Sequence, residues 1–94
     1  MAFITLLGHL SAGHGWPPTP SIEASTKTLV EGRGVVRQGD AYQIHCNPDG
    51  DCHQPFAQSG SSKTLTDGRQ TMRVNDPLTC GDKVGQFSTK RDVG

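Results

Sequence analysis

The feature that most constrains the fold of this chain is an internal repeat. The segment STKTLVEGRGVVRQGD, which starts at Ser25, aligns without a gap with SSKTLTDGRQTMRVND, which starts at Ser61. Half of the positions in this window are identical. Because a short repeated unit cannot bury its hydrophobic face alone, neighbouring copies must stack against one another. The repeat therefore predicts a small fold of about three quasi-equivalent layers around one axis.

Each copy has the pattern of a β-hairpin. An extended run leads to Glu31-Gly32 in the first copy and to Asp67-Gly68 in the second, and another extended run follows. Asp-Gly between two extended runs is a strong hairpin signal, because glycine adopts a positive φ without steric cost. The twelve glycines and six prolines also disfavour long helices. The sequence therefore predicts a single all-β domain over residues 1–94.

A second turn follows each hairpin. The first copy has Gly39-Asp40 at this place and the second has Asn75-Asp76, while Gly8-His9 near the start is typical of a partial third copy. An Asp side chain in such a turn normally bonds to the backbone, so we interpret both aspartates as structural rather than as an acid–base pair. By the same register His9 is a turn residue. Arginines near these turns could pair with the aspartates, and exposed pairs of that kind contribute little to stability.

The rest of the chain divides into a further partial unit and two loops. The tripeptide Ser88-Thr89-Lys90 matches Ser25-Thr26-Lys27, so the C-terminal residues 85–94 are interpreted as the first part of another unit. Residues 15–22 are rich in proline, and residues 47–58 lack a strand pattern. Both segments are predicted to be long loops between the layers.

A potential metal ligand follows each of the three turns at nearly equal spacing, namely His14, His45 and Cys80. A fourth, His53, opens the second hairpin unit. Zinc prefers four nitrogen or sulfur ligands in a tetrahedron, and four protein ligands leave no position for water or substrate. The pattern predicts one structural Zn²⁺ at these four residues and no catalytic residue. Scattered surface histidines with a buried free cysteine are the alternative interpretation.

The other two cysteines leave three possibilities open. Cys46 and Cys52 flank the segment NPDGD and could form a disulfide that closes a small loop. They could also replace His45 or His53 as ligands, or remain unpaired thiols. The total of three cysteines is odd, which does not suit a fold stabilised by disulfides alone.

Composition and charge exclude several classes of protein. The formal net charge is zero and no basic run is present, so no nucleic-acid partner is expected. No apolar run approaches the ~20 residues of a membrane span, and the short apolar start lacks the basic region and cleavage site of a signal peptide. Only 32% of the 94 residues are hydrophobic, which allows a thin core. A metal, a disulfide or a partner is therefore expected as an additional stabiliser.

Two segments carry the pattern of a known family: ASTKTLVEGRGVVRQGD followed by His45, and GSSKTLTDGRQTMRVND followed by Cys80. With GHLSAGHG and HQPFAQSGSS as His-Gly segments, the chain resembles the PAAR-repeat proteins from about Gly8 to Gly94. It departs from them at the signature Pro-Ala-Ala-Arg. The two copies have GVVR and QTMR at this place, so only the arginine is kept.

The resemblance implies a small conical β-structure with threefold pseudo-symmetry and a zinc ion near the vertex. Three His and one Cys hold this ion in the family, which in this sequence implies His14, His45, His53 and Cys80. The resemblance also implies a monomer that caps the trimeric β-helical spike of a contractile phage tail or a type VI secretion system and punctures the target cell envelope.

The implied location is the tail tip of a virion, or the tip of a secreted spike, after assembly in the bacterial cytoplasm. A small structural zinc-binding adaptor in another assembly is the alternative function. An enzyme is not expected.

Overall fold

The structure, a computed structural model, describes residues 2–94 as a helix-free chain with short strands only. No helix able to cross a membrane is present in these residues. Pairs of strands form four separate antiparallel sheets, β1–β8, β2–β3, β4–β5 and β6–β7. The strands are β1 (Ala2–Phe3), β2 (Leu29–Val30), β3 (Arg33–Gly34), β4 (His45–Cys46), β5 (Cys52–His53), β6 (Leu65–Thr66), β7 (Arg69–Gln70) and β8 (Asp92–Val93).

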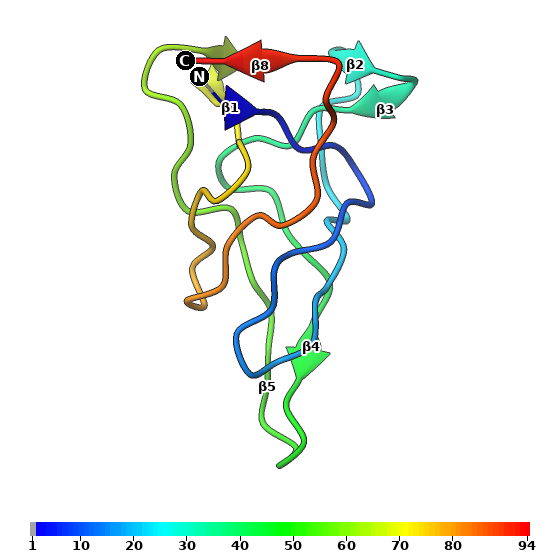
Figure 1. Cartoon of the computed structure of the whole chain (residues 1–94), viewed down its shortest axis with the longest axis vertical. Helices are drawn as coiled ribbons and strands as arrows, with labels where there is room; N and C mark the ends of the chain where they lie inside the picture. The colour runs from blue at the N-terminus through cyan, green and yellow to red at the C-terminus, as the bar shows by residue number, and fades with distance from the viewer. Residues whose placement is uncertain (1) are drawn as a thin grey trace.

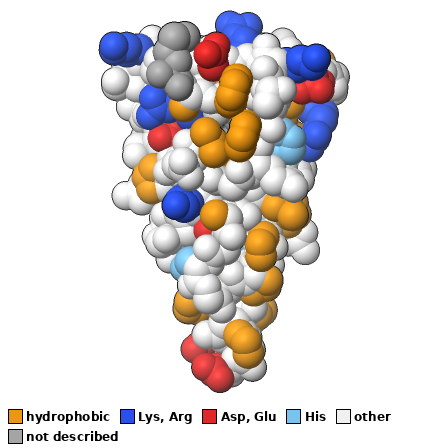
Figure 2. All heavy atoms as spheres, in the orientation of Figure 1, with side chains coloured by type: hydrophobic (Ala, Val, Ile, Leu, Met, Phe, Trp, Pro, Cys, Tyr) orange, Lys and Arg blue, Asp and Glu red, His pale blue; other side chains and the backbone are white. Residues whose placement is uncertain are grey.

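The molecule is a cone that measures 37 × 23 × 22 Å along its principal axes. The sheets β1–β8 and β2–β3 lie at the wide end, and β4–β5 lies at the narrow end (Figure 1). Acidic side chains occupy the narrow tip, and Lys and Arg side chains gather toward the wide end (Figure 2). The expected all-β conical fold of short hairpins is confirmed.

The two hairpins of the repeat form at the predicted turns. Glu31 and Gly32 have φ of 55° and 74°, and Asp67 and Gly68 have φ of 54° and 80°. Two successive residues with positive φ make the tight turn whose twist matches that of the strands on either side. The paired strands are shorter than the predicted extended runs, because the chain leaves its own hairpin after two residues.

The third hairpin is assembled from the two ends of the chain, since β8 pairs with β1. β8 follows Ser88 as β2 follows Ser25 and as β6 follows Ser61. In all three copies the serine hydroxyl accepts the backbone N–H of the residue two positions later, at 3.1 Å. The C-terminal segment is therefore the first part of another unit, as predicted, and the N-terminus supplies its second part.

Beyond the hairpins each copy bonds to the next one around the axis. The backbone N–H of Val36 donates to the carbonyl of Thr5 at 3.1 Å, and that of Met72 donates to the carbonyl of Val36 at 3.0 Å. The N–H of Thr5 donates to Met72 at 3.3 Å and closes the ring. All three residues are fully buried. This ring shows the threefold pseudo-symmetry directly and explains the short strands.

The second set of turns is also equivalent in the three copies. The first residue of each turn has a positive φ: 88° at Gly8, 89° at Gly39 and 71° at Asn75. The next side chain accepts the backbone N–H three residues earlier, at 2.8–3.0 Å, in His9, Asp40 and Asp76. These three residues are turn residues, as predicted.

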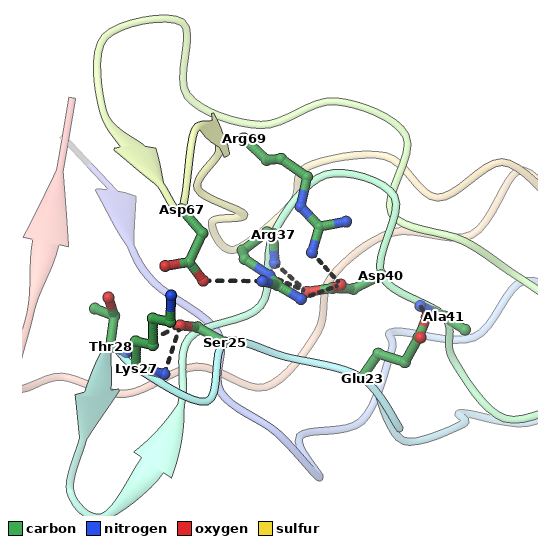
Figure 3. Close-up of polar contacts among 9 residues, drawn as sticks. All are labelled: Glu23, Ser25, Lys27, Thr28, Arg37, Asp40, Ala41, Asp67 and Arg69. Atoms are coloured by element: carbon green, nitrogen blue, oxygen red, sulfur yellow. Dashed lines mark hydrogen bonds and ion pairs between the residues drawn. The ribbon is translucent and has the colours of Figure 1, made fainter.

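One arginine–aspartate network differs from the prediction of exposed pairs. Asp40 is 1% exposed, and its carboxylate accepts from Arg37 at 2.9 Å and from Arg69 at 3.1 Å. Arg37 also contacts Asp67 at 2.8 Å (Figure 3). Arg69 and Asp67 belong to the other copy, so the network joins two copies around a buried carboxylate. Removing one partner from such a pair is costly because a buried charge is left uncompensated.

Two apolar clusters fill the cone. The cluster nearer the wide end contains Ile4, Leu6, Val35 and Val93. The second cluster contains Val36, Tyr42, Ala57, Met72, Leu78 and Val84. The core is therefore small, as the composition predicted.

Below the turns, each copy forms a return loop that is closed by a single bridge. The return loops are residues 10–20, 41–56 and 77–83, closed by Leu10–Pro20, Ala41–Phe56 and Pro77–Lys83. The predicted loop segments 15–22 and 47–58 are correct only in part, because 47–58 contains β5 and because Ser21 and Ala57 pair with the next copy. The loop 41–56 is the longest and carries the sheet β4–β5.

Candidate metal centre

The three return loops bring four potential metal ligands together toward the narrow end. Loop 10–20 carries His14, loop 41–56 carries His45 and His53, and loop 77–83 carries Cys80. One ligand atom of each residue lies within 4.8 Å of the others, so the group could hold a metal ion. These are the four residues selected from the sequence, and we call them the apical cluster.

The sheet β4–β5 sets the position of two members of the apical cluster. His45 is the direct cross-strand partner of His53, and the neighbouring pair is Cys46 with Cys52. Side chains of adjacent residues in a strand point to opposite faces. The two histidines therefore share the face toward the cluster, while the two cysteines share the other face.

Of the three possibilities left open for these cysteines, the structure has the disulfide. Cys46 and Cys52 are bonded, with their Cα atoms 4.0 Å apart. Cys80 is the free cysteine. The disulfide closes the tip loop, residues 47–51, directly beyond the two histidines.

The three separations from His14 in the apical cluster fit tetrahedral coordination. Nε2 of His14 lies 3.4 Å from Nε2 of His45 and 3.3 Å from Nε2 of His53. Sγ of Cys80 lies 3.6 Å from Nε2 of His14 and 3.9 Å from that of His45. Four ligands at ~2.0–2.3 Å from one ion in a tetrahedron are about 3.3–3.6 Å apart. The Nε2 atoms of His45 and His53 lie closer, at 2.5 Å.

The model of one protein family, described as the PAAR motif, matches residues 14–86 of the chain. The chain belongs to the PAAR motif family. The matched range begins at His14 and contains the whole apical cluster. The described residues outside it, 2–13 and 87–94, contribute the third hairpin of this PAAR chain. A comparison with curated proteins returned no match.

A backbone carbonyl orients one histidine of the apical cluster of this PAAR chain. Nδ1 of His45 lies 2.8 Å from the carbonyl oxygen of Pro17. A carbonyl only accepts, so Nδ1 carries a proton, and in the neutral ring the lone pair that can bind a metal ion is then on Nε2. Partners of this kind fix the tautomer and the ring orientation of metal-binding histidines.

Trp16 covers one side of the apical cluster. Its ring stacks on His14 with centroids 4.7 Å apart and on His53 with centroids 4.6 Å apart. Its Nε1–H donates to the carbonyl of Asp51 in the tip loop at 2.8 Å. Trp16 was not among the residues predicted from the sequence, although it is the one tryptophan of the chain and stands two positions after His14.

The environment lowers the pKa of one member of the apical cluster and raises that of another. Desolvation, followed by the neighbouring His45 and His14, lowers the pKa of His53. The neutral imidazole that binds metal is thereby favoured. Burial raises the pKa of the Cys80 thiol. A bound cation would reverse this shift, because a coordinating thiol is deprotonated.

Proposed function

We propose that this PAAR protein caps and sharpens the trimeric β-helical spike of a contractile injection machine, either a phage tail or a type VI secretion system. Membership of the family supports the proposal. The observation that carries it is the closed ring in which Thr5, Val36 and Met72 each donate to the next copy. A monomer with three equivalent copies around an axis can match the threefold end of a trimer, one monomer per trimer.

The wide end has the features that such an interface needs. The three hairpins surround a depression of about 130 Å³, which Val30, Thr66 and Val93 line from equivalent positions. The last strands of a β-helix expose unpaired backbone edges, which promote aggregation unless they are covered. We assign the covering of these edges to the wide end of the cone.

We also propose that the apical cluster binds one structural Zn²⁺. Three imidazoles and one thiolate are a ligand set that suits zinc. Four protein ligands leave no position for water or substrate, so the proposed function is not enzymatic. Structural zinc contributes ~10–16 kcal/mol of apparent binding free energy in zinc-finger peptides. An ion here would tie all three return loops together and stiffen the end that meets the target cell envelope.

In this function the single domain of residues 1–94 is located at the tail tip of a virion, or at the tip of a secreted spike. Assembly with the spike takes place in the bacterial cytoplasm. The proposed partners are the spike and, during penetration, the target envelope, and no nucleic acid takes part.

The test combines metal analysis with a binding assay. The purified chain should contain one zinc per molecule, and its cobalt form should have the absorption spectrum of a closed tetrahedral site. Light scattering after co-purification with a trimeric β-helical spike protein should give one chain per trimer. Val30→Asp places a charge in the wide-end depression and should abolish binding, while Asp49→Asn in the exposed tip loop is the matched control.

Two results would contradict the proposal. A protein with bound zinc and no affinity for the spike would instead be an adaptor in another assembly. A metal site with exchangeable water would favour catalysis.

A further inference from the structure

We propose that Asp82 is the buried counter-charge of the apical cluster and holds two of its loops in register. This inference rests on the proposed metal site and assigns a role to a residue outside the four ligands.

The contacts of Asp82 join two of the loops that carry ligands. Asp82 lies two residues after Cys80, and it is only 2% exposed. Its Oδ1 accepts the backbone N–H of Gly13 at 2.8 Å and that of Lys83 at 2.7 Å. Gly13 directly precedes His14. One carboxylate oxygen therefore links the loop of Cys80 to the loop of His14.

The second oxygen of Asp82 is unusual. Oδ2 is buried and has no hydrogen-bond partner within residues 2–94. Among the ion pairs of these residues, the buried Asp40 has two arginines, and none involves Asp82. A buried carboxylate without a positive partner is strongly destabilising. Asp82 therefore lacks, within the described chain, the compensation that Asp40 has.

The ligand set of the apical cluster supplies that compensation when a divalent ion is bound. A divalent ion with one thiolate and three neutral imidazoles keeps one net positive charge. The carbonyl of Pro17 accepts from Nδ1 of His45, which leaves Nε2 of the neutral ring to bind the ion. A net charge in a partly desolvated site is costly unless an opposite charge lies nearby. Asp82 carries the one negative charge that makes the site neutral.

Other acidic residues near the narrow end are less suited to this role. Asp49 and Asp51 lie in the tip loop and are exposed, so solvent and salt screen their charges. Asp82 is buried, and a Cβ added at its neighbour Gly81 would lie 3.7 Å from Nδ1 of His14.

The experiment measures zinc affinity and thermal stability in Asp82→Asn. The amide has the same shape and retains an acceptor oxygen, but it carries no charge. Zinc affinity, measured by competition with a chromogenic chelator, should fall about 10–100-fold, as it does when an outer partner of a metal site is removed. Asp49→Asn, the exposed control, should change affinity less than twofold, an order-of-magnitude estimate for a screened charge.

The melting temperature of the metal-free protein shows whether Asp82 acts through its charge or only through its structural contacts. Without metal, Asp82→Asn should melt at the same temperature as the wild type or higher, because a buried uncompensated carboxylate has been removed. With zinc it should melt lower. Asp82→Glu keeps the charge and should retain more of the zinc affinity than Asp82→Asn.

Three outcomes would overturn the proposal. They are an unchanged zinc affinity in Asp82→Asn, equal destabilisation with and without metal, and equal losses of affinity in Asp82→Glu and Asp82→Asn. A wild-type chain that binds no zinc would overturn the proposed metal site itself, and this inference with it.

Discussion

The disulfide beside the apical cluster should contribute a measurable share of stability. Cys46 and Cys52 have a sequence separation of 6, so they close a short loop. For a loop of this length the chain-entropy relation gives about 2 kcal/mol at 25 °C. In the double variant Cys46→Ser/Cys52→Ser, the free energy of unfolding should therefore fall by about 2 kcal/mol.

The loss in free energy of unfolding can be measured as a shift of the melting temperature. One kcal/mol shifts the midpoint of a domain of this size by roughly 4–8 °C, so the zinc-loaded double variant should melt about 8–16 °C lower. Circular dichroism with saturating zinc measures this shift without a reductant. The variant keeps Cys80 and both histidines of β4–β5, so it retains all four members of the apical cluster.

A measurement of zinc affinity tests whether the disulfide also holds the two histidines of β4–β5 in place. His45 and His53 are paired immediately before the disulfide, so loss of the disulfide should also weaken zinc binding, by at most about 30-fold if the full ~2 kcal/mol is expressed there. An unchanged midpoint and an unchanged affinity would refute the reasoning, because the tip loop would then be fixed by its other contacts alone. One such contact is the bond from Trp16 to Asp51.

Three other predictions follow from the same structure. Trp16 emission should change when zinc binds, because its ring stacks on His14 and His53; a chelator titration that leaves the emission constant would contradict the stacking. Asp40→Asn should lower the free energy of unfolding by about 1.5–3 kcal/mol, because charge-assisted hydrogen bonds to Asp40 are lost. Asp76→Asn should lower it by less, because Asp76 pairs with one arginine and Asp40 with two; equal losses in urea melts would contradict this ranking. Burial lowers the pKa of His9, and desolvation with neighbouring imidazoles lowers that of His53, so the unfolded chain binds more protons. The free energy of unfolding of the metal-free protein should therefore be highest above pH ~6.5 and should fall as the pH drops below that value. A free energy of unfolding that stays constant between pH 5 and 7 would contradict these shifts.

The hairpins and the clustering of His14, His45, His53 and Cys80 could be predicted, because both depend on local patterns that the repeat shows more than once. A turn such as Asp67-Gly68 needs two residues that tolerate positive φ, and these two residues are adjacent in the sequence, so the turn can be recognised there. The grouping of His14, His45 and Cys80 followed from their nearly equal distances from equivalent turns. The closeness of all four ligand atoms agrees with that spacing.

The contacts between copies could not be predicted in the same way. The burial of Asp40 depends on Arg69, which reaches it from the other copy. The short strands have a related cause, since the residues after Gly34 pair with another copy. Asp82 could not be selected from the sequence, because a single aspartate in a loop has no periodic pattern; its burial and its contacts distinguish it only in the structure.

The third hairpin has a topological consequence. Because β1 pairs with β8, residues 2–94 follow an almost closed circle around the axis. A linker between β8 and β1 would take the place that Glu31-Gly32 and Asp67-Gly68 have in the other two copies. A short linker could seal this gap, and the circle could then be opened at either of those turns. The same cone would result from a permuted gene, since its shape depends on the cyclic order of the three copies and not on which of them is translated first.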